Sequence, residues 1–323
     1  MSKPSVMIVR AIFPEVLARL EQVFDVESNQ EDIVLSPTEL ARRLQGKQGA
    51  LTTGGDRIDA ALLAACPDLK ICANMAVGTN NFDLAAMASR GVVATNTPDV
   101  LTETTADFGF ALMMATARRI SEGEAYLRAG QWTKWGHDLL AGSDIHGATL
   151  GILGMGRIGQ GIAKRGAHGF GMNVVYHNRS RLSAELEAEC KARYVSKDEL
   201  LQIADHLVLV LPYSAAAHHA IGAAELATMK PTASLVNIAR GGIVDDAALA
   251  HALKAGQIAA AGLDVFEGEP AVHPDLLALR NVVLTPHIAS SSLSTRMAMA
   301  NLAGDNLLAF FAGQPLLTPV SAG

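Results

Sequence analysis

The sequence predicts an α/β protein with two doubly wound parallel sheets. The first observation is that short apolar, strand-like segments alternate with helix-like segments along most of the chain. The second is length, because 323 residues suffice for roughly two domains of ~150 residues each. The third is a glycine-rich turn at 154–159, which follows a strand pattern and opens a helix pattern. About 150 residues precede this turn, so we expect a separate domain before it.

The first hundred residues predict one α/β unit. Strands are expected at 6–9, 49–52, 69–73 and 92–95, with helices at 14–23, 58–65 and 84–89 between them. From 101 to 129 the pattern predicts one long helix that joins this unit to the next.

The second half predicts a sheet of six buried strands. They are expected at 150–153, 173–176, 207–211, 234–238, 260–263 and 282–285, each separated from the next by a helical segment. No strand is predicted after the final helix at 293–311, so we expect that helix to return to the first domain.

Composition excludes several kinds of partner. The formal net charge of −6 disfavours nucleic acid and anionic membranes, and no apolar run reaches the ~20 residues of a membrane helix. The opening strand pattern at 6–9 is too short for the core of a signal peptide. Cys66, Cys72 and Cys190 form no C-x-x-C motif and favour a reduced, cytoplasmic protein.

No metal site is expected from the histidines. His218 and His219 are adjacent rather than four residues apart, and no Asp or Cys cluster accompanies them in the sequence.

The glycines at mid-chain form a dinucleotide-binding fingerprint. Gly154, Gly156 and Gly159 give G-x-G-x-x-G between a strand pattern and a helix pattern. In that context backbone N–H groups and a helix N-terminus bind a pyrophosphate.

The segment after the second strand of this unit indicates which dinucleotide binds. A free ribose 2′-hydroxyl calls for an acidic residue about 20 positions beyond the glycines, but Asn178 stands there. Arg179, Ser180 and Arg181 follow, and cationic donors with a hydroxyl suit a 2′-phosphate. We therefore expect NADP(H) to be preferred, with NAD(H) as the alternative.

Three ionisable side chains follow three successive predicted strands. They are Arg240, Glu269 and His287, and all should reach the carboxyl edge of the sheet. A 2-oxo acid needs a guanidinium for its carboxylate and carbonyl, an acid to protonate the oxygen, and a carboxylate to orient that acid. Arginine, histidine and glutamate fit these roles in that order.

Four ordered motifs carry a family resemblance. The glycine fingerprint, 237–245 (NIARGGIVD), 261–270 (AGLDVFEGEP) and 284–290 (LTPHIAS) look like the D-isomer-specific 2-hydroxyacid dehydrogenases. Within that family, 97–102 (TPDVLT), 132–135 (WTKW) and 177–181 (HNRSR) are most similar to glyoxylate/hydroxypyruvate and 2-ketogluconate reductases. The resemblance implies a Rossmann cofactor domain at 101–289, inserted in a flavodoxin-like substrate domain made of 1–100 plus 290–323.

The resemblance also implies roles for individual residues. Arg240, Glu269 and His287 would be the catalytic set, with the Val77 and Gly78 amides on the substrate carboxylate and Ser290 close by. The expected cofactor contacts are Arg157 and Ile158 at the pyrophosphate, with Pro212, Ile238 and Asp264 lining the rest of the site. Trp135 matches a position that reaches into the neighbouring subunit's site, which implies a homodimer.

The sequence leaves the substrate and two alternatives open. We expect reduction of glyoxylate and hydroxypyruvate, with 2-ketogluconate as a further candidate, and Thr79 replaces a tyrosine of many relatives in the substrate loop. One alternative is an NAD-preferring dehydrogenase of other specificity. The other is a dinucleotide-sensing binding protein of the corepressor type. A short-chain dehydrogenase is excluded, because no tyrosine has a lysine four residues on.

Overall fold

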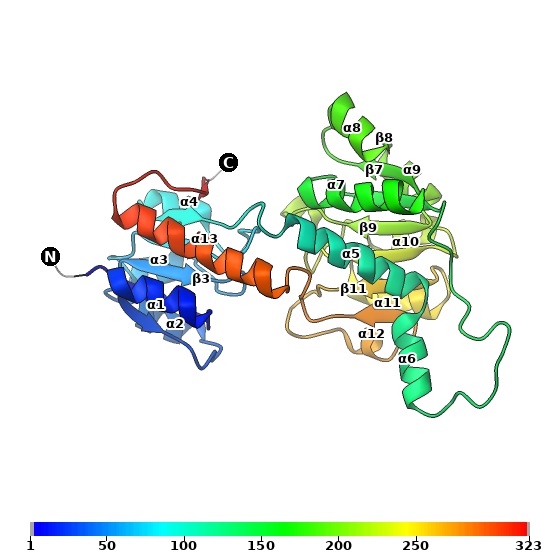
Figure 1. Cartoon of the computed structure of the whole chain (residues 1–323), viewed down its shortest axis with the longest axis horizontal. Coiled ribbons are helices and arrows are strands. Elements are labelled where there is room, and N and C mark those ends of the chain that lie inside the picture. Colours follow the sequence, from blue (N-terminus) through cyan, green and yellow to red (C-terminus); the bar gives the residue numbers. More distant parts are fainter. Residues whose placement is uncertain (1–2, 322–323) are drawn as a thin grey trace. The chain divides into compact units, whose positions relative to one another are not determined.

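The computed structural model describes residues 3–321 and separates into two compact units. Unit 1 comprises Met1–Leu101 and Ser291–Gly323, and unit 2 comprises Thr102–Ser290 (Figure 1). Each unit has one mostly parallel sheet with helices between its strands, so the predicted α/β class is confirmed. No helix within residues 3–321 combines the length and apolar character needed to cross a membrane.

Unit 1 is built on a six-stranded sheet of order β13-β5-β4-β3-β1-β2. All neighbouring strands pair in parallel except β13 and β5, which are antiparallel. Its strands are β1 (Ser5–Ile8), β2 (Asp25–Ser28), β3 (Gly49–Thr52), β4 (Ile71–Asn74), β5 (Val93–Thr95) and β13 (Pro319–Val320). Its helices are α1 (Pro14–Val23), α2 (Pro37–Leu44), α3 (Ala60–Ala65), α4 (Leu84–Ser89) and α13 (Leu293–Phe311).

Side chains alternate between the two faces along each strand, and helices cover both faces. On one face Met7 packs with Leu40, Leu62 and other residues of α2, α3 and α4. On the other face the neighbouring Val6 packs with residues of α1 and α13, including Leu20.

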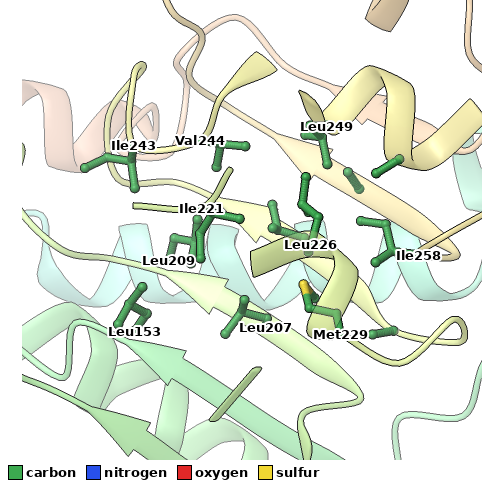
Figure 2. Packing of buried hydrophobic residues seen from close by; sticks show 14 of the residues in the cluster. Leu153, Leu207, Leu209, Ile221, Leu226, Met229, Ile243, Val244, Leu249 and Ile258 are labelled. Atoms are coloured by element: carbon green, nitrogen blue, oxygen red, sulfur yellow. The ribbon is translucent and has the colours of Figure 1, made fainter. Parts of the chain in front are cut away.

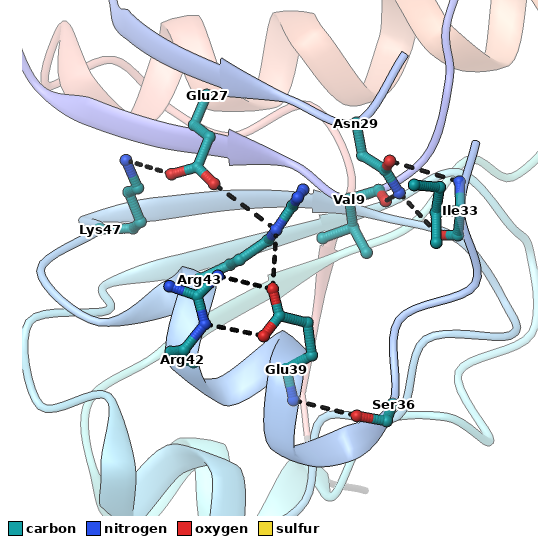
Figure 3. Close-up of polar contacts among 9 residues, drawn as sticks. All are labelled: Val9, Glu27, Asn29, Ile33, Ser36, Glu39, Arg42, Arg43 and Lys47. Carbon is teal, nitrogen blue, oxygen red and sulfur yellow. Dashed lines mark hydrogen bonds and ion pairs between the residues drawn. The ribbon is translucent and has the colours of Figure 1, made fainter. Parts of the chain in front are cut away.

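The sequence patterns missed β2, α2 and the C-terminal strand β13, which pairs with β5. Figure 3 shows polar contacts of β2 and α2. Ser36 caps α2 by accepting a hydrogen bond from the Glu39 amide at 3.2 Å. Glu39 in turn accepts from the guanidinium of Arg42, at 2.6 and 2.7 Å. On β2, Glu27 pairs with Lys47 at 3.0 Å. The Ser-x-x-Glu spacing at 36–39 is a helix-start signal that could have revealed α2.

Unit 2 is built on a seven-stranded parallel sheet of order β12-β11-β10-β9-β6-β7-β8. Its strands are β6 (Thr149–Leu153), β7 (Asn173–His177), β8 (Ala192–Tyr194), β9 (His206–Leu209), β10 (Ser234–Asn237), β11 (Ala260–Leu263) and β12 (Val282–Leu284). Its helices are α5 (Thr102–Ala117), α6 (Ile120–Arg128), α7 (Arg157–Lys164), α8 (Ala184–Cys190), α9 (Lys197–Ile203), α10 (Ala223–Thr228), α11 (Asp246–Lys254) and α12 (Pro274–Leu277). The short edge strand β8 was not predicted.

Two apolar clusters cover the faces of the second sheet. One joins strand residues such as Leu207 to α9, α10 and α11, with Leu226 and Leu249 pointing into it (Figure 2). The other joins the opposite face to α5, α7 and α8 and includes Met113 and Ile162. Because both faces are covered, a ligand is expected to bind outside the carboxyl ends of the strands.

The predicted continuous helix at 101–129 is wrong. The segment forms two helices, α5 and α6. Arg119, between them, adopts a left-handed conformation with φ 55°. The chain returns at Gly142 and Ser143, where the Ser143 amide donates to the carbonyl of Ala117 at 2.9 Å. Gly142 lies so close to that carbonyl that a Cβ would collide with it. Tertiary packing therefore ends a helix that local sequence would have continued.

Candidate active site

Arg240, Glu269 and His287 follow three neighbouring strands of unit 2. Arg240 comes after β10, Glu269 after β11 and His287 after β12. These strands are adjacent and parallel, so their carboxyl ends meet at one edge of the sheet. The structure thus brings the three residues together at the edge where open α/β sheets bind ligands.

Glu269 and His287 form a direct pair. Nδ1 of His287 lies 2.7 Å from Oε2 of Glu269, and the Phe266 amide donates to Oε1 at 2.9 Å. Burial raises the pKa of Glu269, but these hydrogen bonds and the nearby charges of His287 and Arg240 outweigh it and leave that pKa below its ordinary value. The carboxylate therefore stays ionised and fixes the orientation of the imidazole. No protein group in the described chain is hydrogen-bonded to Nε2 of His287, which leaves it for a ligand.

A buried carboxylate holds the backbone that carries His287. Asp264 is fully buried, and its oxygens accept from the amides of Ile288 and Ala289 and from the hydroxyl of Thr285, each at 2.8 Å. The His287 amide donates to the backbone carbonyl of Asp264 at 2.9 Å. These bonds support the left-handed conformation of His287, with φ 53°, which a histidine adopts at some cost.

Asp264, which the resemblance places among the residues that line the cofactor, is fully buried in this structure. Burial raises its pKa, and three donors oppose that effect. The hydrogen bonds of its side chain hold the backbone segment that follows His287.

Arg240 is held against the segment that carries Glu269. Its Nη1 donates to the Ala239 carbonyl at 2.6 Å, and the buried Asn237 donates to the Arg240 carbonyl at 3.2 Å. The next residue, Gly241, lies so close to the Phe266 carbonyl that a Cβ would overlap it. Burial lowers the pKa of Arg240 and the charge of Glu269 opposes this. An arginine stays protonated regardless, so the site keeps a fixed positive charge.

The glycine turn fits a dinucleotide pyrophosphate. Gly154 has φ 101°, and a Cβ there would lie 2.5 Å from the Leu211 amide nitrogen. A Cβ on Gly159 would lie 2.5 Å from the Gly154 carbonyl, so the turn and α7 pack too closely for side chains. By contrast, a Cβ on Gly156 would meet no atom within 4 Å, and Gly156 begins α7 without a side-chain cap. The amino end of α7 is thus open to an anion.

The predicted ribose-end residues behave differently from one another. Asn178 accepts a hydrogen bond from the Met155 amide at 2.6 Å, which links it to the glycine turn. Arg181 is bound in two places to Glu187, at 2.7 and 2.8 Å. Arg179 and Ser180 are exposed, and Arg179 has no ion-pair partner among the residues that the structure describes. Arg179 is therefore the more available cation of the two.

The remaining predicted residues lie as follows. In unit 2, Arg157 and Ile158 open α7, Pro212 is exposed after β9, Ile238 is buried after β10 and Ser290 is half-buried after the His287 segment. In unit 1, Val77 and Gly78 are half-buried, and their carbonyls accept from Asn96 at 2.8 Å and Asn74 at 3.1 Å. Trp135 is 75% exposed.

Comparison with known proteins gives a consistent result. Residues 110–289 match the family model of the D-isomer specific 2-hydroxyacid dehydrogenases, NAD binding domain. The chain is 46% identical over 316 residues to a glyoxylate reductase of Thermococcus onnurineus, and 44% identical over 317 residues to one of Pyrococcus horikoshii. Each alignment covers 97% of this chain and 94% of the relative.

A solved structure extends the comparison. The NADPH-dependent glyoxylate/hydroxypyruvate reductase of Sinorhizobium meliloti, in complex with NADP and malonate, matches with a TM-score of 0.88 and 37% identity. That match covers 99% of this chain and 97% of the other.

Proposed function

The chain belongs to the D-isomer specific 2-hydroxyacid dehydrogenases, and on that premise we propose that it is an NADPH-dependent reductase of glyoxylate and hydroxypyruvate. The observation that carries the chemistry is the His287–Glu269 pair beside Arg240, at one sheet edge of a unit with a dinucleotide-binding turn. The products would be glycolate and D-glycerate.

We assign each of the three residues one task in the reaction. A bound nicotinamide cofactor supplies the hydride. Arg240 holds the carboxylate of the substrate and polarises its carbonyl, because its charge persists at any working pH. His287 donates a proton from Nε2 to the carbonyl oxygen as the hydride arrives. Glu269 keeps the imidazole oriented and charged through the 2.7 Å contact with Nδ1.

The preference for NADPH rests on the ribose end of the site. An acid that would repel a 2′-phosphate is replaced by Asn178, and the exposed Arg179 and Ser180 can donate to a phosphate. Arg181 would first have to leave Glu187, so Arg179 is the main discriminating residue. NAD(H) remains the alternative cofactor.

The proposed substrates are small 2-oxo acids. Arg240 supplies one guanidinium for one carboxylate, and the amides of Val77 and Gly78 stay predicted partners of that carboxylate from the family resemblance. A second anionic group on the substrate would need a further cation, since burying an unpaired charge costs several kcal/mol. Glyoxylate and hydroxypyruvate carry no such group, and neither does 2-ketogluconate, which is the further candidate.

The proposal includes a homodimer. Helix α6 has no buried residue, and large apolar side chains are exposed along it and in the segment after it. These residues are Ile120, Leu127, Trp132, Trp135 and Leu139. A run of apolar side chains of this kind is typical of a protein interface. Trp135 would then be available to the partner's site, as the resemblance implies.

One assay separates the enzyme from a dinucleotide-sensing binding protein. The purified chain is mixed with glyoxylate and NADPH, and NADPH oxidation is followed. Turnover supports the proposal, whereas NADPH binding without turnover supports the sensor. A cytoplasmic location is also proposed, and it agrees with Cys66, Cys72 and Cys190 being buried and free.

A further inference from the structure

Two adjacent histidines and a glutamate outside the catalytic set converge in unit 2. His218 and His219 follow the short 3-10 turn Ala215–Ala217, and Glu267 follows β11. Nε2 of His219 lies 2.9 Å from one oxygen of Glu267, and Nε2 of His218 lies 3.9 Å from the other. The two imidazole rings are stacked, with centroids 3.9 Å apart. One nitrogen or oxygen from each residue lies within 4.8 Å of the others.

The other nitrogen of each imidazole faces an oxygen. Nδ1 of His218 is 3.2 Å from the Tyr213 hydroxyl, and Nδ1 of His219 is 3.8 Å from a carboxylate oxygen of Asp245. The second oxygen of Asp245 caps α11 by accepting from the Ala248 amide at 2.9 Å, which fixes that carboxylate in place. Histidines that bind metals are commonly oriented by an oxygen hydrogen-bonded to the other ring nitrogen, and the Tyr213 hydroxyl is in that position for His218. The Asp245 carboxylate lies behind the ring of His219 but beyond hydrogen-bond distance.

We propose that His218, His219 and Glu267 form a binding site for Zn²⁺ or a similar divalent transition cation. Zn²⁺ takes imidazole nitrogen and carboxylate oxygen at about 2.0–2.2 Å, which places tetrahedral ligands roughly 3.4 Å apart. The two contacts from Glu267, of 2.9 and 3.9 Å, bracket that spacing. Two imidazoles select such a cation over Mg²⁺ or Ca²⁺, which prefer oxygen ligands alone.

The cluster is reachable from solvent. The side chains of His218, His219 and Glu267 are 43%, 36% and 43% exposed. A cation can therefore enter directly, and water can complete its coordination.

The site would connect loops next to the candidate active site. The His219 amide donates to the Gly242 carbonyl at 2.7 Å, just beyond Arg240, and Glu267 lies two residues before Glu269. A bound cation would tie the segment after β9 to the segment after β11 and stabilise unit 2. This inference does not depend on the substrate or on the cofactor preference proposed above.

The test is a zinc titration of the full chain. After treatment with a chelator, the chain is titrated with ZnCl₂ by calorimetry, and separately with MgCl₂. We expect saturable binding of Zn²⁺ at the cluster and a higher melting temperature with Zn²⁺, but neither effect with Mg²⁺. His218→Ala, His219→Ala and Glu267→Gln should each weaken zinc binding at least tenfold. His251→Ala, an exposed histidine on α11, is the matched control and should bind like the wild type.

Two results would overturn the site. One is the absence of saturable zinc binding, and the other is wild-type zinc affinity in Glu267→Gln or in a folded histidine variant. Glu267→Gln keeps the size of the side chain, so it decides the matter even if a histidine variant folds poorly. A melting curve without zinc shows whether each variant is folded.

Discussion

Replacing Glu269 by glutamine removes the negative charge beside His287 and keeps the size of the side chain. The two carboxylate oxygens each accept one hydrogen bond, from Nδ1 of His287 at 2.7 Å and from the Phe266 amide at 2.9 Å. Glutamine has only one such oxygen, and its NH₂ group would face the other donor. The variant therefore loses one of the two bonds and the charge that favours the imidazolium.

The size of the loss follows from the bond that is removed. A hydrogen bond to a charged group contributes about 1.5–3 kcal/mol, and 1.36 kcal/mol corresponds to a factor of ten. We expect kcat for glyoxylate reduction to fall about 10- to 150-fold. The lower part of that range applies, because the Glu269 side chain is 32% exposed and water screens the pair.

The assay is steady-state glyoxylate reduction with NADPH, measured over a range of pH. The pKa of Glu269 is lowered in the folded protein, so its carboxylate is ionised at neutral pH and the advantage over Glu269→Gln should be present there. As the pH falls through the lowered pKa, the carboxylate is protonated and the advantage should vanish. Glu199→Gln, in an exposed pair with Arg193, is the matched control and should keep wild-type kcat. A Glu269→Gln enzyme with wild-type kcat at neutral pH would refute the role of Glu269.

Four further variants and one mass measurement test other parts of the proposal. His287→Ala should lower kcat by roughly 10²–10⁴-fold, the usual contribution of a general acid, and near-wild-type turnover would remove His287 from the mechanism. Arg179→Ala should abolish most of the preference for NADPH over NADH in kcat/KM. Glu187→Gln should lower KM for NADPH, because it releases Arg181. If the ratio of kcat/KM for NADPH to that for NADH is unchanged in both variants, the assignment is contradicted. Trp135→Ala should raise KM for the 2-oxo acid without changing cofactor affinity. Light scattering should give twice the mass of one chain, and a monomer at working concentration would exclude the dimer.

Local patterns in the sequence were enough to predict the fold class and most strands. Buried strands such as β3 and β11 are apolar on both faces and therefore stand out in the sequence. The edge strands β2 and β8 are short and carry polar residues, so they did not. The end of α5 was also missed, because it depends on contacts with Gly142 and Ser143 from beyond α6.

Some residues of the candidate site could be predicted from the sequence, and others could not. Arg240, Glu269 and His287 could be predicted because each follows a recognisable strand, and parallel topology places strand ends together. The partners of other residues could not be predicted. Glu187 holds Arg181, and Glu267 meets His219 from 48 positions away, both through contacts that only the folded chain creates.

The most direct test of the central claim is a panel of 2-oxo acids with the wild-type chain and both cofactors. We predict that NADPH gives a clearly higher kcat/KM than NADH, and that hydroxypyruvate outperforms phosphohydroxypyruvate and oxaloacetate, with D-glycerate as the product. Equal use of NADH, or higher kcat/KM on the substrates with a second anion, would contradict the proposed function. An L-product would contradict the stereochemistry that the family assignment requires.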